Sequence, residues 1–345
     1  MNEDKLVFSL KMIKKHINYA LGLSDDKYAV TGYDLLPALL KAVAYNAYVE
    51  TVSNKTDTLN LRCEASLISM IEYSYLNYIK GVSNKIELNK KPVILAFDYT
   101  DEDFYGDVQG FDIHGWTGKD AITGHFKFLT CSIISDDIPE KIPLISVPIK
   151  IGHSKSHTIL YCLSLIKHYV GDIKLILFDR EFHNNDLMFE LTKWKYPYLI
   201  FVKKFTEYKN LLEELEEKKT IFVHDYTVNK NQSNYNGENY LAFLKQIYDP
   251  RSEKNYDWIF ATNVEEIALS NLIETYKKRW RIETQFRVQD EARIKCKSID
   301  MKIRYFLFLF EQMLQTIWIC FYKEESTFKE FLIELSKMSR KWTKN

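Results

Sequence analysis

Hydrophobic and polar positions divide the chain into regions with different periodicities. In residues 1–90 the apolar side chains recur at helical spacing, as they do at Leu6, Leu10 and Ile13. Because positions three and four apart share one face of a helix, this part is predicted to be helical. From Pro92 onward the pattern changes to short apolar runs, which are typical of strands buried on both faces. We therefore predict a helical N-terminal region followed by a domain built on a sheet.

The middle of the chain alternates segments of strand and helix character. The order β-β-β-α-β-α-β predicts an α/β fold with a mixed sheet and helices packed against it. The expected strands lie at 93–98, 125–134, 142–151, 174–179 and 198–203, and the expected helices at 156–169 and 184–194. Residues 101–120 are rich in Gly and Asp and are predicted to form a turn.

A β-rich insertion is predicted at about residues 204–258. It begins with the charge run at 211–219, which is typical of a solvated helix, and the strands expected in this part of the chain are 220–225, 241–248 and 258–262. A long helix is expected over 265–294. The predicted division is a helical N-terminal region (1–90), a catalytic domain (91–300) and a C-terminal helical region (301–345).

The apolar stretch from Tyr305 to Tyr322 is nearly long enough to cross a bilayer. It contains Glu311, Gln312 and Gln315, which are costly at the middle of a membrane. We therefore predict a buried core helix and no membrane association.

Charge and cysteine content narrow the function classes. The formal net charge is zero, which counts against a uniformly basic nucleic-acid-binding chain. Between Lys277 and Arg304, however, ten Lys and Arg stand against four Asp and Glu, so a local basic strip is present. The five cysteines form no CxxC pair, and the N-terminus lacks a signal-peptide pattern. These features predict a cytoplasmic protein without a disulfide framework or zinc site.

The most informative segment is YKKRWRIETQFR at 276–287. On a helix Tyr276, Arg279, Glu283 and Arg287 fall on one stripe, because they are spaced by three, four and four residues. The stripe places one carboxylate among guanidinium groups, as in a site that holds a metal ion and a phosphate.

Two upstream apolar runs end in aspartate, at Asp98 and Asp179. A carboxylate at the end of a strand is held by a rigid element, and Mg²⁺ and Mn²⁺ prefer such oxygen ligands. Together with Glu283, the two aspartates predict a two-metal phosphoryl-transfer site. An aspartate after a strand also commonly caps a loop. The alternative carboxylates nearby are Asp101, Asp103, Asp107 and Glu181.

The basic residues of this region have two interpretations. Arg279 supports a phosphate or a metal site, or it forms only an i,i+4 ion pair with Glu283. Trp280 stacks on an unpaired base, or it is a partly buried tryptophan of the core. The DNA contacts predicted from this basic strip are Tyr276, Lys278, Arg279, Trp280, Arg281, Arg287 and Arg293.

These motifs resemble those of DDE transposases of the IS4-like group. Tyr276-x2-Arg279-x3-Glu283 is similar to that group's signature around the catalytic glutamate. FDYTDEDFYG around Asp98 and ILFDREF around Asp179 resemble its two aspartate motifs. The similarity spans about residues 92–290. The group's usual lysine, seven residues after the glutamate, is replaced here by Asp290, which resembles the ISH3-type branch. Basic residues that could replace that lysine are Arg287, Arg293, Lys295 and Lys297.

The resemblance implies a ribonuclease-H-like fold and a Mg²⁺-dependent triad of Asp98, Asp179 and Glu283, with two ions per site and Mn²⁺ as a substitute. It implies hydrolysis at transposon ends, followed by attack of the freed 3′-hydroxyls on target DNA. A homodimer in a synaptic complex is expected, with residues 1–90 binding the terminal inverted repeats. The alternatives are an inactive or domesticated DNA-binding protein, and a nuclease without strand transfer.

Overall fold

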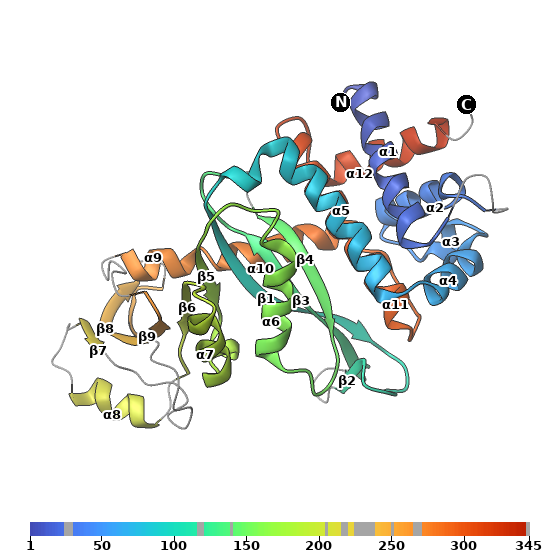
Figure 1. The fold of residues 1–345 in the computed structure, drawn as a ribbon. Helices are drawn as coiled ribbons and strands as arrows, with labels where there is room; N and C mark the ends of the chain where they lie inside the picture. Colours follow the sequence, from blue (N-terminus) through green and yellow to red (C-terminus); the bar gives the residue numbers. More distant parts are fainter. Residues whose placement is uncertain are drawn as a thin grey trace.

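A mixed sheet runs through the molecule and is flanked by helices (Figure 1). The structure is a computed structural model that describes residues 1–23, 30–115, 121–138, 141–203, 206–214, 220–223, 239–249, 252–264 and 271–342. Within these residues the sheet has nine strands. Eight follow the order β2-β3-β1-β5-β6-β9-β8-β7, and β4 pairs with β3 along the same edge as β2, opposite β1. Their bounds are β1 Val93–Phe104, β2 Ile113–Gly115, β3 Gly124–Ile133, β4 Ile142–Ile149, β5 Ile173–Phe178, β6 Tyr198–Phe201, β7 Thr220–Val223, β8 Tyr240–Asp249 and β9 Lys254–Thr262.

The centre of the sheet is parallel and its flanks are antiparallel. Strand β5 runs parallel to both β1 and β6, and two helices make the crossovers, α6 (Lys155–Ile166) and α7 (Asn185–Lys193). The coarse prediction of a mixed sheet with flanking helices is therefore confirmed.

Helices from the two ends of the chain pack together on one side of the sheet (Figure 1). The first five are α1 Glu3–Ala20, α2 Gly32–Tyr45, α3 Val49–Val52, α4 Thr56–Ala65 and α5 Ile68–Ile86, and the last two are α11 Met301–Phe321 and α12 Phe328–Trp342. Helix α12 packs on α2, and α11 packs on α4, α5 and strand β4. The limits of the predicted regions remain predictions.

Strand β1 is longer than the predicted strand at 93–98, and the predicted turn at 101–120 is wrong in its first part. The strand continues to Phe104 because β3 keeps pairing with it, from Asp98 opposite Thr130 to Phe104 opposite Gly124. Its pairing with β5 ends earlier, at Phe97 opposite Phe178. Asp98 therefore marks the end of the parallel pairing but not the end of the strand. Residues 116–120 of the predicted turn lie outside the described residues.

The long helix predicted over 265–294 is divided. Residues 265–270 lie outside the described part, and the rest forms α9 (Leu272–Lys277), α10 (Trp280–Gln289) and a short 3₁₀ turn, η4 (Asp290–Ala292). Between α9 and α10 the N–H groups of Lys278 and Arg279 bond to carbonyls three residues back. This tighter turn brings residues three apart almost into line, so the stripe continues from α9 into α10.

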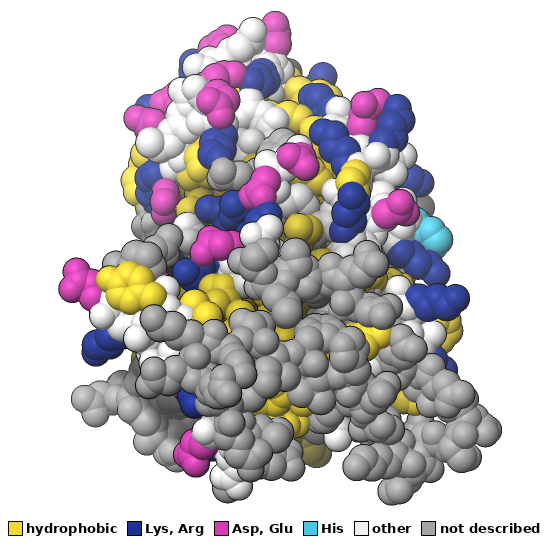
Figure 2. Space-filling model, turned by 90° about the vertical axis from the view of Figure 1, so that its left-hand side faces the viewer, with side chains coloured by type: hydrophobic (Ala, Val, Ile, Leu, Met, Phe, Trp, Pro, Cys, Tyr) yellow, Lys and Arg dark blue, Asp and Glu magenta, His cyan; other side chains and the backbone are white. Residues whose placement is uncertain are grey.

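In the predicted insertion the structure has α8 (Thr206–Glu214) and the strands β7 to β9. Figure 2 shows the molecule from this side, where basic and acidic side chains of the described residues are interspersed. Strand β9 pairs with β6, so these strands extend the central sheet. The apolar stretch that ends at Tyr322 lies in α11, where Glu311 and Gln312 are buried and hydrogen-bonded within the protein. Among the helices of the described residues, none combines the length and apolarity that crossing a membrane requires.

Candidate active site

The two predicted aspartates are neighbours at the centre of the sheet. Asp98 follows Phe97 and Asp179 follows Phe178, and these two phenylalanines are register partners. Side chains alternate between the faces of a strand, so Asp98 lies on the face of Ala96. Ala96 packs in one cluster with Leu177 and with Ile282 of α10. The sheet therefore directs Asp98 toward the helix that carries Glu283.

Backbone donors fix both carboxylates. Asp98 Oδ1 accepts the N–H of Tyr99 at 2.9 Å, and Asp179 Oδ1 accepts the N–H of Arg180 at 2.6 Å. The second of these bonds opens a 3₁₀ turn, η2 (Arg180–Phe182). Each aspartate is thus held at its own strand before any contact with the helix.

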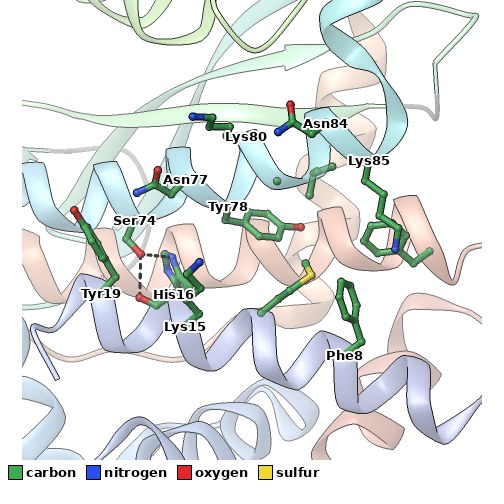
Figure 3. A pocket seen from close by; sticks show the side chains of 14 residues that line it. Phe8, Lys15, His16, Tyr19, Ser74, Asn77, Tyr78, Lys80, Asn84 and Lys85 are labelled. Carbon is green, nitrogen blue, oxygen red and sulfur yellow. Dashed lines mark hydrogen bonds between the residues drawn. The ribbon is translucent and has the colours of Figure 1, made fainter. Parts of the chain in front are cut away.

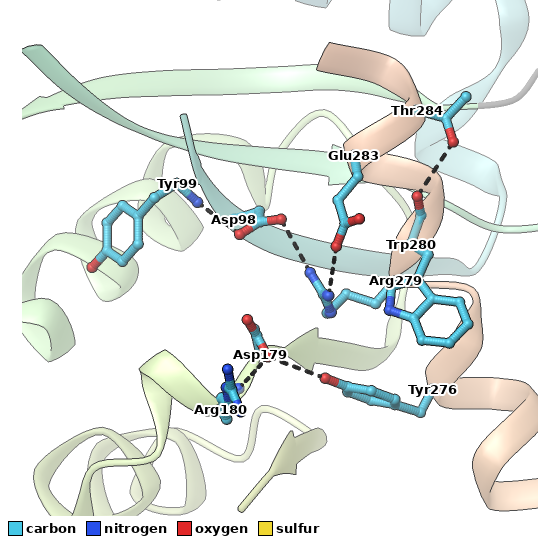
Figure 4. A network of polar contacts seen from close by, with 9 residues as sticks. All are labelled: Asp98, Tyr99, Asp179, Arg180, Tyr276, Arg279, Trp280, Glu283 and Thr284. Atoms are coloured by element: carbon cyan, nitrogen blue, oxygen red, sulfur yellow. Dashed lines mark hydrogen bonds and ion pairs between the residues drawn. The ribbon is translucent and has the colours of Figure 1, made fainter. Parts of the chain in front are cut away.

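Arg279 joins the sheet to the helix (Figure 4). Its guanidinium donates to Asp98 Oδ2 at 3.0 Å and to Glu283 Oε1 at 2.8 Å. From the preceding turn, the Tyr276 hydroxyl donates to Asp179 Oδ1 at 3.5 Å. The structure therefore brings together five of the predicted residues around one space.

Burial and charge act against each other here. Burial raises the pKa of Asp98 to about 6, and Asp179 and Glu283 act in the same direction, while Arg279 and the Tyr99 N–H oppose the rise. Burial also works against the charge of Arg279, but Tyr276, Asp98 and the other carboxylates outweigh it and raise the pKa of the guanidinium. Arg279 is 4% exposed and stays charged, so Asp98 is ionised near pH 7.

The donor chemistry of this site suits a hard divalent cation, because Asp98, Asp179 and Glu283 offer carboxylate oxygens from three elements. In the described residues, no three His, Cys, Asp or Glu side chains lie close enough together to hold a metal ion as they stand. The guanidinium of Arg279 lies between Asp98 and Glu283 and supplies the compensating charge. An ion shared by these two carboxylates would need Arg279 to move aside.

The other basic residues of the strip differ in their contacts. Lys278 and Arg281 both pair with Asp136, which follows β3, so neither is a free cation. The Arg293 guanidinium lies 3.7 Å from Asp290 Oδ1, as an ion pair. Arg287 is exposed. Trp280 is 36% exposed, so its side chain is partly buried and partly open to solvent, and both interpretations remain predictions.

Asp136 was not predicted as part of this region. Like Asp98 and Asp179 it follows an apolar strand, and that position was the available signal. Of the alternative carboxylates, Asp101 places its Oδ1 atom 3.8 Å from His125 Nε2, and Glu181 places its Oε1 atom 3.7 Å from Lys155 Nζ. In the described part of the chain, Arg279 forms its ion pairs with Asp98 and Glu283 and not with these alternatives.

Part of the chain is similar to a known protein family. Residues 149–304 match the model described as a transposase DDE domain. The matched range contains Asp179, Tyr276, Arg279 and Glu283, and it begins after Asp98. The match supports a DDE transposase and thus an enzyme of the nuclease and transposase class. No curated protein matches the chain.

Among solved structures, the chain is similar to the piggyBac transposase in a cryo-EM structure of its synaptic complex with hairpin DNA. The TM-score is 0.53 at 14% sequence identity, and the match covers 100% of this chain and 73% of that one. At this identity the likeness shows the fold alone, a central mixed sheet with helices that a transposase also has.

Proposed function

We propose that this chain is a DNA transposase of the cut-and-paste type, in which Asp98, Asp179 and Glu283 form the catalytic triad. One observation carries the proposal: the three carboxylates come from β1, the end of β5 and α10, and they face one space around Arg279. The reaction is hydrolysis at the transposon ends, followed by transfer of the 3′-hydroxyl ends into target DNA. The fold is ribonuclease-H-like in this proposal.

The cofactor in this proposal is Mg²⁺, with Mn²⁺ as a substitute, held by the same three carboxylates as two ions per site. Two such ions activate the attacking oxygen and stabilise the leaving oxygen of an in-line displacement. The sheet positions Asp98 and Asp179 rigidly, and α10 delivers Glu283. Arg279, once displaced from the carboxylates, would be placed to hold a phosphate through two parallel hydrogen bonds.

DNA contacts are assigned to the basic strip, with Arg287 as its exposed member and Trp280 as a surface that can stack on a base. Residues 1–90 bind the terminal inverted repeats, and the active species is a homodimer in the synaptic complex. Asp290 at the position of the usual lysine supports assignment to an ISH3-type branch of the IS4-like group, an insertion-sequence transposase of a prokaryotic cell.

The decisive experiment is cleavage of a DNA duplex that carries the element's own terminal repeat, with and without Mg²⁺. We expect Mg²⁺-dependent cleavage at the end by the parent chain. We expect a loss of at least about 100-fold in Glu283→Gln, because a carboxylate ligand is removed from the charge-stabilising site. Binding of the duplex should be retained. A supercoiled target plasmid then tests joining of the cleaved ends.

Glu274→Gln is the matched control, because Glu274 lies on α9 with a side chain 75% exposed and, within the described residues, pairs only with Lys277 on the same helix. Equal cleavage by the parent and Glu283→Gln would show that the catalytic carboxylate is another residue. Binding without cleavage by the parent would favour an inactive DNA-binding protein. Cleavage without joining would favour a nuclease.

A further inference from the structure

A groove separate from the carboxylate site lies between α1 and α5 (Figure 3). It measures about 610 Å³ and shares no residue with the site around Arg279. Its lining residues recur at helical spacing along both helices, and Phe321 at the end of α11 adds to the lining. The aromatic residues of the lining are Phe8, Tyr19, Tyr78 and Phe321. Phe8 is 45% exposed and Tyr19 is 47% exposed, so flat apolar surface is left uncovered here.

The charge of the groove has one sign. Lys15 of α1 and Lys80 and Lys85 of α5 line it, and no carboxylate of the described residues does. Lys85 lies 4.8 Å above the ring of Phe8 and 4.1 Å above that of Phe321. A ligand that suits this lining combines a flat ring with negative charge.

A buried histidine adds a specific acceptor. His16 lines the groove, is 3% exposed, and its Nε2 has no hydrogen-bond partner in the part of the chain that the structure describes. The Ser74 hydroxyl donates to His16 O at 2.9 Å, so its oxygen accepts from His16 Nδ1–H at 2.8 Å. Burial lowers the pKa of His16 to about 4, so the ring is neutral near pH 7. Nε2 therefore carries a lone pair that is buried beneath the groove lining, and a ligand group that reaches it needs an N–H or O–H donor.

Gly81 opens the α5 side of the groove. It lies inside a 19-residue helix, where glycine is unfavourable by roughly 1 kcal/mol relative to alanine. A Cβ atom at this position would meet no atom within 4 Å, so packing within the fold does not require glycine. Its bare backbone lets a flat group approach α5 closely.

We propose that this groove binds an unpaired nucleotide of single-stranded DNA. The exposed rings of Phe8 and Tyr19 stack on a base, the lysines neutralise the flanking phosphates, and His16 Nε2 accepts an N–H from the edge of the base. A base can stack on these rings only after it has left the duplex, where its ring N–H groups are occupied in Watson–Crick pairs, so the base must be unpaired. The inference rests on the proposed function only in taking DNA as the substrate.

The test measures binding of the full chain to a fluorescein-labelled single-stranded oligonucleotide and to the corresponding duplex by fluorescence anisotropy. Gly81→Leu places a side chain in the groove, and we expect at least a tenfold loss of single-strand affinity with less than a twofold change for the duplex. Ser69→Leu is the control, because Ser69 is exposed on the same helix and outside the groove. The melting temperature of Gly81→Leu should not fall below that of the parent.

Lys15→Gln with Lys80→Gln should also reduce the salt dependence of single-strand binding, by about 0.7 in the log–log slope for each phosphate that is no longer neutralised. A photo-crosslink from 4-thiothymidine in the oligonucleotide should map to peptides of α1 or α5. Unchanged single-strand affinity in Gly81→Leu would overturn the proposal, as would an equal loss for duplex and single strand. A change of oligomeric state in Gly81→Leu would instead identify the groove as a protein interface.

Failure of this inference and failure of the proposed function give different results. Glu283→Gln should lose cleavage and keep single-strand binding. If the parent does not cleave but Gly81→Leu still loses single-strand affinity selectively, the groove proposal stands without the transposase. If cleavage depends on Glu283 while Gly81→Leu binds like the parent, the transposase stands without the groove.

Discussion

The carboxylate site and the α1–α5 groove both bury a titratable side chain, and they differ in how its charge is balanced. At the carboxylate site Asp98 is ionised, and the guanidinium of Arg279 compensates it at 3.0 Å. In the groove His16 is neutral, and the lysines around it face no carboxylate of the described lining. At the carboxylate site, the charge of Asp98 is neutralised by a side chain of the same protein. In the groove, the lysines have no carboxylate partner among the described lining residues, and His16 Nε2 has no hydrogen-bond donor in the described part of the chain.

This difference separates two kinds of site. An internally balanced cluster is stable while empty, and a ligand must displace a partner to enter it. The groove, by contrast, leaves the buried His16 acceptor without a partner among the described residues until something binds there, and buried polar groups are costly without partners. Changes at the carboxylate site should therefore affect stability first, and changes at the groove should affect binding first.

The largest effect on stability is expected at Arg279. Arg279→Ala removes the charged partner of the half-buried Asp98 carboxylate. We expect the free energy of unfolding to fall by about 3 kcal/mol, the lower end of the range for a buried pair, because the Asp98 side chain is 17% exposed. Urea denaturation at pH 7.5 measures it. Arg287→Ala on the same helix is the control, since Arg287 is exposed. Adding Asp98→Asn to Arg279→Ala should recover part of the loss, and no recovery would show that the uncompensated charge is not its cause.

A pH-dependent effect is expected at His16. Its folded-state pKa is lowered to about 4, so the unfolded chain takes up the proton first as the pH falls. Its stabilisation is present above pH 6.5 and is lost on acidification, by about 3 kcal/mol near pH 4. The measurement is the free energy of unfolding of the parent and of His16→Phe as a function of pH, from about pH 4.5 to about pH 7.5. The free energy of the parent should fall more steeply with decreasing pH than that of the variant. Equal slopes would contradict a neutral buried imidazole.

The smallest effect is expected at Gly81. Gly81→Ala should raise the free energy of unfolding by about 0.5 to 1 kcal/mol, because the helix gains a better helix former and no contact is strained. Gly171→Ala is the contrasting variant, since a Cβ there would lie 2.3 Å from the carbonyl oxygen of Lys91. Denaturant unfolding measures both. Destabilisation by Gly81→Ala would mean that the groove side of α5 is filled in the folded protein.

The carboxylate site was predictable in part from the sequence because its spacing is local. Arg279 follows Tyr276 by three residues and Glu283 follows Arg279 by four, which places all three on one stripe of a helix. Apolar runs precede both Asp98 and Asp179. The link between Arg279 and Asp98 was not predictable, because it depends on the register of two distant segments. The length of β1 was missed for a similar reason, since its polar second half is paired by β3.

The groove gave no comparable signal. His16 lies among the apolar residues of an amphipathic helix, as an ordinary core histidine does. Its unused Nε2 emerges only from how α1, α5 and α11 pack together. The periodicity of apolar residues identifies which face of a helix is buried. It does not show where two packed helices leave a groove between them.

The pairing of β9 with β6 has a consequence for how this chain tolerates change. Three residue pairs, from Leu199 opposite Thr262 to Phe201 opposite Phe260, fix where the chain leaves the sheet toward α9 and α10. A slip of one residue between β6 and β9 would turn every side chain of β9 to the other face and change the point from which the Glu283 helix starts. The phase of this one strand pair therefore sets which face of the sheet the chain leaves toward the Glu283 helix.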